Sequence, residues 1–360
     1  MKIAQIAPLA ERCPPSTYGG TERIVSYLTE ELVQQGHDVT LFASGDSVTR
    51  AELVPCCNLA LRLDTRVCDP LPYHLMMVNR VMTRAEEFDV LHFHIDMLHY
   101  PLLRRMPIRS VTTLHGRLDL PDLQPFYASF PDFALVSVSA AQRLPMPPVN
   151  WAGTVHHGLP PQLLTCCANP RGDYLAFLGR IAPEKRPDRA IEIARRAGMQ
   201  LKIAAKIDRV DRCYWESTIG PLVAANPHVE YIGEIGEREK SAFLGNARAL
   251  LFPVDWPEPF GLVMIEAMAC GTPVVAFSAG SVSEIIDPGV SGYVVHGIDE
   301  AVAAVHRASA LPRTGVRAAF EARFTVARMA SDYVQIYGSL DKSGAADTPA
   351  GQSDELEVLA

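Results

Sequence analysis

Short apolar runs alternate with amphipathic segments along the first part of the chain. KIAQIAPL (2–9) is typical of a buried strand, TERIVSYLTEELVQQG (21–36) has the apolar spacing of a helix that ends at Gly36, and HDVTLFAS (37–44) predicts the next strand. Such alternation predicts a parallel sheet built from strand–helix–strand units. The runs that continue it to about residue 141 are FDVLHFHI (88–95), RSVTTLHG (109–116) and FALVSVSA (133–140).

A stretch rich in proline and turn residues, PMPPVNWAGTVHHGLPPQ (145–162), interrupts this pattern and predicts a passage between domains. Strand and helix patterns then resume from YLAFLGR (174–180) to SGYVVH (291–296), which predicts a second doubly wound domain. The helical pattern RMASDYVQIYGSL (328–340) closes the ordered chain, and we expect the small, polar and acidic residues 341–360 to be disordered. The predicted parts are residues 1–155, 156–325, 326–340 and 341–360.

Composition agrees with two soluble domains and narrows their chemistry. A chain of 360 residues suits two domains of roughly 150 residues each, and two domains imply a cleft. The net charge of −8 argues against a general nucleic-acid binder. Eight cysteines without CxxC spacing suggest neither a disulfide framework nor a zinc site. No run reaches the roughly 18 apolar residues of a spanning helix, and the opening residues do not resemble a signal peptide, so we expect a cytoplasmic protein.

Two loops at strand-to-helix junctions are candidates for binding anions. STYGGTER (16–23) opens the first predicted helix, where free N–H groups and the helix dipole favour an anion and where Gly19 and Gly20 allow close approach; a plain tight turn is about as well supported. GRIAPEKRP (179–187) brings Arg180 and Lys185 together after a strand, an arrangement that suits a diphosphate. The alternative for this second loop is a solvated basic turn, which is our interpretation for Arg186 and Arg189.

In the segment DWPEPFGLVMIEAMACGTPVVAF (255–277), the helical pattern 262–269 is apolar except for Glu266. A buried carboxylate without a partner is costly, so Glu266 requires a fixed one. Glu258 lies in the proline-bounded entry, and Gly261 precedes a helix whose first N–H groups lack intrahelical partners. Both carboxylates could therefore reach one elongated, hydroxyl-rich molecule. The alternative partner for Glu266 is a buried arginine.

The histidines are harder to interpret. His92 and His94 share one face of a predicted strand, a spacing that metals use, but no carboxylate pair lies near them in the sequence, so lining of a core or cleft is the better interpretation. His115 ends an apolar strand, where ligands meet the sheet of an open α/β domain, and a place in the cleft is slightly favoured. His156 and His157 lie in the passage between domains and support no inference.

Taken together, YGGTER (18–23), TLHG (113–116), GRIAPEK (179–185) and EPFGLVMIEAMACGTPVVA (258–276), with Glu258 and Glu266 eight positions apart, resemble the family 4 retaining glycosyltransferases. The resemblance runs from about residue 1 to 340. It implies the α/β architecture called GT-B: two Rossmann-like doubly wound domains that face a cleft, with the last helix crossing back to the first domain. The second domain would bind most of a sugar nucleotide, and the first domain most of the acceptor.

The resemblance also implies roles for individual residues. Arg180 and Lys185 would hold the diphosphate, Glu258 the hydroxyls of the donor sugar, and Glu266 those of the ribose. These cations and Glu258 form the implied catalytic set together with His115, which would line the sugar pocket. Gly20 would approach the phosphates when the two domains close. The backbone near Gly233 and Ile235 would contact the nucleotide base. The implied donor-binding residues are Gly19, Gly20, Gly233, Ile235, Phe260, Gly261, Leu262 and Glu266.

Such enzymes transfer sugars with retention, without an evident protein nucleophile, a cofactor or an essential metal. The expected co-substrate is uridine diphosphate glucose, followed by guanosine- and adenosine-linked donors, and the acceptor is a saccharide, a lipid-linked compound or a small molecule. Two features depart from the family pattern. AGSVSEII (279–286) has Ser281 where a second glycine is common, which leaves the contacts of Glu284 open, and HHGLPP (156–161) replaces an asparagine–glycine turn.

Three alternatives remain open at this stage. A sugar-nucleotide epimerase or a phosphorylase would use the same fold, and a non-catalytic protein could bind the nucleotide sugar alone; presence of all the implied donor-site residues favours an enzyme. LLRRMPIR (102–109) is either a basic and apolar patch at the inner membrane surface or a solvated turn, and the turn is favoured.

Overall fold

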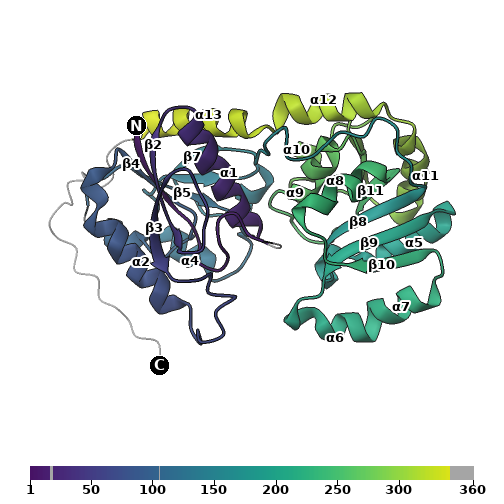
Figure 1. Cartoon of the computed structure of the whole chain (residues 1–360), viewed down its shortest axis with the longest axis horizontal. Helices are drawn as coiled ribbons and strands as arrows, with labels where there is room; N and C mark the ends of the chain where they lie inside the picture. Colours follow the sequence, from purple (N-terminus) through teal and green to yellow (C-terminus); the bar gives the residue numbers. More distant parts are fainter. Residues whose placement is uncertain (17–18, 105, 341–360) are drawn as a thin grey trace.

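The computed structural model describes residues 1–16, 19–104 and 106–340. Two α/β domains lie side by side, and residues 313–339 run along one side of both (Figure 1). The expected pair of doubly wound domains is therefore confirmed. The segment 341–360, which we expected to be disordered, lies outside the described residues. Within the described ranges, no helix is long and apolar enough to cross a membrane.

The first domain is built on a seven-stranded parallel sheet. Its strands are β1 (Lys2–Ile6), β2 (Asp38–Ser44), β3 (Glu52–Cys57), β4 (Val90–Phe93), β5 (Ser110–Leu114), β6 (Leu135–Ser137) and β7 (Trp151–Thr154). They lie in the order β3-β2-β1-β4-β5-β6-β7, so the strand order reverses between β1 and β4. The helical segments are α1 (Gly20–Gln34), α2 (Leu71–Thr83), η1 (Ala85–Glu87), α3 (Tyr100–Leu103), α4 (Leu123–Ala128) and η2 (Ala141–Arg143).

The second domain repeats this plan with six parallel strands. They are β8 (Tyr174–Arg180), β9 (Gln200–Lys206), β10 (Val229–Gly233), β11 (Ala249–Phe252), β12 (Val274–Phe277) and β13 (Gly292–Val295). The order is β10-β9-β8-β11-β12-β13, with its reversal between β8 and β11. The helical segments are η3 (Pro183–Lys185), α5 (Pro187–Ala197), η4 (Arg209–Asp211), α6 (Arg212–Tyr214), η5 (Trp215–Ile219), α7 (Gly220–Ala225), α8 (Glu237–Asn246), α9 (Leu262–Ala269), α10 (Val282–Ile285), α11 (Ile298–Ser309) and α12 (Arg313–Arg323).

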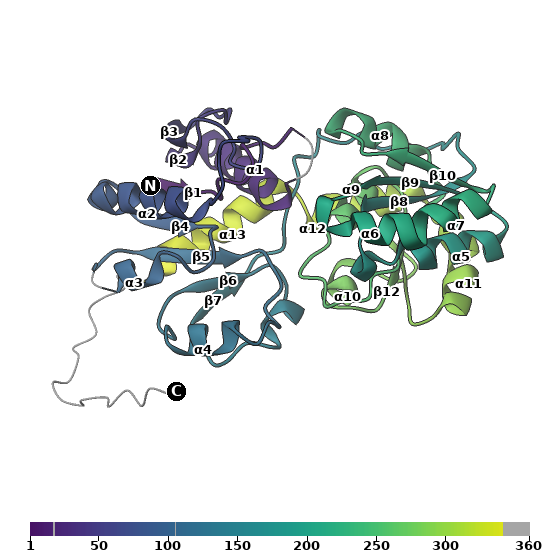
Figure 2. The ribbon, with the colours of Figure 1, turned by 90° about the horizontal axis from the view of Figure 1, so that it is seen from below.

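Burial on both faces explains why the strands are continuous apolar runs. β11 and β12 are buried along their whole length, as parallel strands covered by helices on both sides must be. Figure 2 shows both sheets between their helices, with the chain crossing from one domain to the other at a narrow junction.

The passage between domains is shorter than the sequence pattern predicts. Within residues 145–162, Trp151–Thr154 form the edge strand β7 of the first sheet. The proline-rich flanks and Gly153 concealed this short strand, since both residue types are typical of turns.

The stretch 102–109 contains the end of α3 and a turn, with Leu102 exposed and Leu103 buried, and Arg105 lies outside the described residues.

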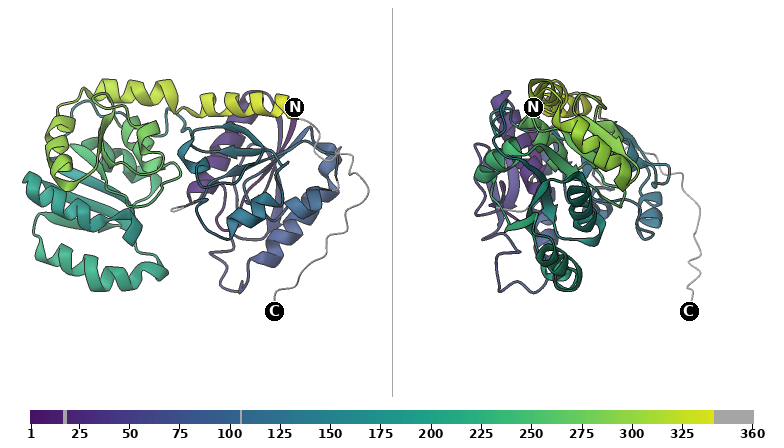
Figure 3. Two further views of the ribbon diagram at one scale, coloured as in Figure 1. Left: turned by 180° about the vertical axis from the view of Figure 1, so that it is seen from behind. Right: turned by 90° about the vertical axis from the view of Figure 1, so that its right-hand side faces the viewer.

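The last helix, α13 (Val326–Ser339), returns to the first domain as expected. Thr325 Oγ1 accepts a hydrogen bond from the backbone N–H of Arg328 and caps the helix start. The two segments that connect the domains, one around Leu159 and one between α12 and α13, lie against each other. Leu159 exchanges backbone hydrogen bonds with Phe324 and Val326. Figure 3 shows α12 and α13 end to end along one side of both domains.

Candidate active site

A cavity of about 570 Å³ lies between the two domains. It opens at the carboxyl ends of both sheets, close to the point where each strand order reverses, which is where open α/β sheets bind ligands. The first domain contributes Pro8, Gly19, Gly20, Thr21, Glu22, Arg23, Arg62, His115 and Gly116. The chief contributors from the second domain are Arg180, Glu184, Lys185, Lys206, Glu234, Ile235, Lys240, Trp256, Glu258, Phe260, Gly261, Leu262 and Glu266.

The cavity brings together nearly all the residues singled out in the sequence. Of the implied catalytic and donor-binding residues, Gly233 is not part of the lining. It ends the edge strand β10 with a φ of 84°, and the two residues that follow it, Glu234 and Ile235, reach the cavity instead. Strand-to-helix junctions far apart in sequence converge here because the carboxyl ends of parallel strands share one edge of a sheet.

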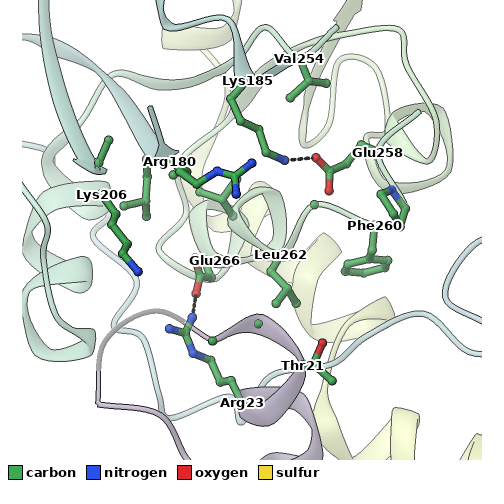
Figure 4. Close-up of a pocket in the computed structure, with 18 of the residues that line it drawn as sticks. Thr21, Arg23, Arg180, Lys185, Lys206, Val254, Glu258, Phe260, Leu262 and Glu266 are labelled. Carbon is green, nitrogen blue, oxygen red and sulfur yellow. Dashed lines mark hydrogen bonds and ion pairs between the residues drawn. The ribbon is translucent and has the colours of Figure 1, made fainter. Parts of the chain in front are cut away.

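Glu266 has partners within the protein itself. Its Oε1 accepts hydrogen bonds from Arg23 Nη1 at 2.8 Å and from Lys240 Nζ at 2.6 Å, and its side chain is 4% exposed. Arg23 comes from α1 of the first domain, so this contact crosses the cleft (Figure 4). The buried arginine that the sequence left open as a partner of Glu266 is therefore present, and the implied contact of Glu266 with ribose hydroxyls stays a prediction. A second buried cation, Lys240, was not foreseen.

Two opposed effects set the charge of Glu266. Burial alone would raise the pKa of this carboxyl group, but Lys240 and Arg23 outweigh burial and lower it. The group is therefore a carboxylate at neutral pH. It lies about one turn inside α9.

The start of α9 depends on a glycine. Gly261 has a φ of 79°, in the left-handed region that favours glycine. A Cβ at this position would lie 2.7 Å from Met264 Cε and 3.1 Å from Phe252 Cζ. Leu262 follows at the cavity wall, so the tight turn brings backbone at the N-terminus of the helix to the cavity.

Glu258 and Lys185 form an ion pair at the cavity wall (Figure 4). Glu258 also accepts a hydrogen bond from Trp256 Nε1 at 2.9 Å, and Lys185 Nζ lies 4.6 Å from the Trp256 ring centroid. The loop that departs from the family pattern supports this region, since Ser281 donates from Oγ to the Phe260 carbonyl at 2.9 Å and from its backbone N–H to the Glu258 carbonyl at 3.0 Å. Ser281 therefore holds the loop that carries Glu258 through two hydrogen bonds to its backbone.

Arg180 also has carboxylate partners in the second domain. Its Nη2 lies 2.5 Å from Glu184 Oε1 and its Nε lies 3.2 Å from Asp211 Oδ2. The register of the sheet places Lys206, the last residue of β9, directly beside Arg180. Lys206 lines the cavity and was missed, although its place at the carboxyl end of LKIAAK was a usable signal.

The other cations of this loop behave as the solvated-turn interpretation predicts. Arg186 pairs with Asp188 at 2.8 Å and with Asp255 at 2.6 Å, and Arg189 pairs with Asp255 at 2.9 Å. Neither residue lines the cavity between the domains.

The histidines belong to the interior of the first domain and to the cavity. His92 Nδ1 lies 2.7 Å from Tyr337 Oη and its Nε2 lies 2.7 Å from Thr113 Oγ1, so it is a hydrogen-bonded core residue. His115 lines the cavity, as expected, and stacks on His157, which lines it too. Burial lowers the pKa of His115 to about 3, so its ring is neutral at physiological pH.

Glu284 joins the two domains. Its carboxylate accepts backbone hydrogen bonds from Ala140 at 2.8 Å and Ala141 at 2.7 Å in the first domain, and His156 Nε2 lies 3.1 Å away. Beside it, Ser139 Oγ donates to the Pro259 carbonyl at 2.7 Å. The contact that the sequence left open is thus a link between the domains.

Glu284→Ala is expected to lower the free energy of unfolding by about 2 kcal/mol at pH 7, because hydrogen bonds to a charged group are lost. Burial alone would raise the pKa of Glu284, but hydrogen bonds from His156, Ala140 and Ala141 outweigh it and lower the pKa below 4.5. The stabilisation is therefore complete above the unfolded-state pKa and is lost as the pH falls through the lowered folded-state pKa.

Urea unfolding of wild type and Glu284→Ala at pH 7 and at pH 3 tests this expectation. The difference between the two proteins should shrink at pH 3. Glu321→Ala is the control, because Glu321 is 53% exposed and pairs only with Arg317 on one face of α12. A difference of the same size at both pH values would contradict the assignment.

Two parallel-sheet domains of this topology, with a cavity between them and a last helix that returns to the first domain, define the GT-B class. The family model described as Glycosyltransferase Family 4 matches residues 18–164, and the one described as Glycosyl transferases group 1 matches residues 168–320. The chain belongs to the family 4, group 1 glycosyltransferases.

Individual relatives either match part of the chain at about 30% identity or match nearly all of it at lower identity. The D-inositol 3-phosphate glycosyltransferase of Salinispora arenicola is 32% identical over 187 residues, which are 47% of this chain and 41% of that protein. The chain therefore spans about two fifths of that relative's length. The phosphatidyl-myo-inositol mannosyltransferase of Mycobacterium leprae is 25% identical over 96% of this chain and 98% of that protein.

Solved structures agree on the fold. A sucrose-phosphate synthase from Thermosynechococcus elongatus superposes with a TM-score of 0.76 at 18% identity, covering 94% of this chain and 98% of the other. HepE of Anabaena, solved in complex with UDP-glucose, has a TM-score of 0.69 at 15% identity and covers 94% and 100% of the two chains.

Proposed function

We propose that this protein is a retaining, metal-independent glycosyltransferase that moves a hexose from a nucleoside-diphosphate sugar to an acceptor hydroxyl. One observation carries the proposal: Arg180, Lys185 and the N-terminus of α9 converge on the same cavity as the carboxylates Glu258 and Glu266. Cations and helix N–H groups suit a diphosphate, and carboxylates suit sugar and ribose hydroxyls.

Donor binding would exchange partners within the cavity. The diphosphate would replace Glu184 as a partner of Arg180 and Glu258 as the partner of Lys185. Glu258, released from Lys185, would then accept hydrogen bonds from the donor sugar. Until the phosphates arrive, these carboxylates hold the two cations at the cavity wall.

Glu266 would bind the ribose while keeping its own ion pairs. A carboxylate has about four acceptor positions, and the contacts from Arg23 and Lys240 both fall on Oε1. Ribose hydroxyls would donate to the remaining capacity. Because Arg23 comes from the first domain, the same carboxylate would also link donor binding to the position of that domain.

In the transfer step, the bond between the anomeric carbon and the leaving diphosphate oxygen breaks, and the acceptor oxygen bonds to that carbon on the same face. Arg180 and Lys185 stabilise the negative charge on the departing diphosphate. An oxygen of that diphosphate takes the proton of the acceptor hydroxyl, which balances the reaction without a protein nucleophile. The residues of the cavity position the two substrates.

The identity of the substrates is part of the proposal. UDP-glucose is the first donor to test, which the complex of HepE with this compound supports. Relatives named for D-inositol 3-phosphate and for phosphatidyl-myo-inositol make phosphorylated inositols and lipid-linked acceptors the first acceptor candidates.

A panel of uridine, guanosine and adenosine diphosphates and their glucose and mannose conjugates tests the donor site by thermal shift and calorimetry. A ligand that binds only the folded state stabilises it by about 2.7 kcal/mol at a hundredfold excess over Kd, so the matching nucleotide should raise Tm. Glu266→Gln should lower the affinity for this nucleotide, whereas Glu192→Gln, a change on the surface of α5, should not. Binding of none of these nucleotides to wild type would overturn the donor-site assignment.

Consumption of the donor separates the proposed function from its rivals. A glycosyltransferase turns over the donor when an acceptor hydroxyl is present and forms a new glycosidic product. An epimerase would convert the donor without acceptor, a phosphorylase would require inorganic phosphate, and a binding protein would leave the donor intact.

A further inference from the structure

A chain of buried polar side chains connects the interior of the first domain to the cavity. Gln5 on β1 and His94, just after β4, are 0% and 2% exposed. His94 Nε2 lies 2.8 Å from Gln5 Oε1, and His94 Nδ1 lies 2.8 Å from His115 Nε2. His115 lines the cavity, so a contact made by Gln5 is relayed to the cavity wall.

The chemistry of these groups gives each hydrogen bond one direction. Burial lowers the pKa of His94 far below its usual value and that of His115 to about 3, so both rings are neutral. A neutral imidazole has one N–H and one acceptor nitrogen. The Gln5 amide oxygen can only accept, so His94 carries its proton on Nε2 and accepts at Nδ1. His115 must then donate from Nε2, which leaves a lone pair on its Nδ1.

The other end of the Gln5 amide, Nε2, faces Tyr337 Oη and His92 Nδ1. Gln5 Nε2 donates to Tyr337 Oη at 3.2 Å, and Tyr337 Oη in turn meets His92 Nδ1 at 2.7 Å. Beyond His92, the bonds continue to Thr113 Oγ1 and from there to Tyr333 Oη at 3.0 Å. Tyr333 and Tyr337 belong to α13, so the returning helix anchors the network.

A separate observation points to a ligand. His115 Nδ1 is buried and has no hydrogen-bond partner within the described residues. A buried acceptor without a partner costs free energy that a donor group of a bound molecule would recover. Because His115 lines the cavity, a molecule bound there is a source of such a donor.

We propose that Gln5 and His94 are positioning residues that hold His115 in the Nε2–H tautomer, so that its Nδ1 lone pair selects a donor sugar with a hydroxyl at the matching position. This inference rests on the proposed function for its ligand, but the tautomer is a property of the protein alone. His115 touches the sugar, and the other two residues act through it.

Nitrogen-15 NMR of the histidine rings in the unliganded wild type tests the tautomer. His115, assigned by comparison with His115→Asn, should show the Nε2–H pattern and should not titrate between pH 5 and 8. An Nδ1–H pattern, an averaged pattern or titration in this range would each overturn the proposal. The result does not depend on nucleotide binding, so it stands even if the proposed function fails.

Deoxy and deoxyfluoro analogues of UDP-glucose test the selectivity. At one sugar position, loss of the hydroxyl should weaken binding about tenfold, because the acceptor stays unpaired. A fluorine at the same position should bind no better than hydrogen, since it cannot donate to a lone pair. Stronger binding of the fluoro analogue than of the deoxy analogue at the position that contacts His115 would show an N–H there and would overturn the proposal.

Gln5→Met removes the amide, so the proton of the His115 ring should no longer be fixed on Nε2. The His115 spectrum should become averaged, and the preference for hydroxyl over hydrogen should fall to within about twofold, while affinity for plain uridine diphosphate stays the same. Thr113→Val is the matched control, since it is equally buried and removes the bonds to His92 and Tyr333 while the Gln5–His94–His115 bonds stay in place. Equal weakening of sugar nucleotide and nucleoside diphosphate in Gln5→Met, or the same spectral change in Thr113→Val, would show a merely structural role.

Discussion

Glu266→Ala is expected to lower the free energy of unfolding by about 3–5 kcal/mol, because removal of one member of a buried ion pair leaves an uncompensated charge. The side chains of Lys240 and Arg23 are 7% and 11% exposed, so the variant would leave two largely buried positive charges. Glu237 lies 3.6 Å from Lys240 and 3.4 Å from Arg23 and recovers only part of the loss. Urea unfolding followed by circular dichroism measures the change.

Two companion variants make this expectation specific. Glu192→Ala removes a surface carboxylate and should change the free energy of unfolding by no more than about 0.5 kcal/mol. The double variant Glu266→Met, Lys240→Met removes both charges and should recover much of the lost stability, because apolar replacements fill a similar volume. It should still fail to bind the nucleotide. A single Glu266→Ala variant as stable as wild type would show that the ion pair is not buried in solution.

Arg180→Ala is expected to lower turnover by a factor of about 10²–10³, the cost of losing one preorganised group that stabilises charge in the transition state. Arg180 is suited to this role because Glu184 and Asp211 hold its guanidinium at the cavity wall. The loss should fall mainly on kcat, since negative charge on the diphosphate increases as the sugar departs.

Steady-state kinetics with the donor found in the binding panel measure this effect. Arg186→Ala is the matched control: it removes a cation six positions along the chain whose partners Asp188 and Asp255 lie outside the cavity, and it should retain nearly full activity. An unchanged rate for Arg180→Ala, or an equal loss in both variants, would contradict the proposed role of Arg180.

Much of the architecture was predictable because the central strands are apolar on both faces. Runs such as VVAF in β12 are buried along their whole length. In a chain where such runs alternate with helical segments, they indicate strands that helices cover on both sides. β7 was missed because an edge strand with little burial carries turn-like residues such as Gly153. The helix α9 and its start directly after Gly261 were predictable, because this glycine precedes an apolar helical run.

The sequence by itself determined that functional residues gather at strand-to-helix junctions, since parallel strands deliver their carboxyl ends to one edge. It also showed that Glu266 needed a partner, because a lone carboxylate in an apolar helix is costly. Only the tertiary structure decided which partner. Arg23 lies 243 positions from Glu266 along the chain and on the other domain, and Lys240 lies 26 positions away on a different helix. The first pairing depends on how the two domains are placed and the second on how α8 packs against α9, and local patterns of residues encode neither.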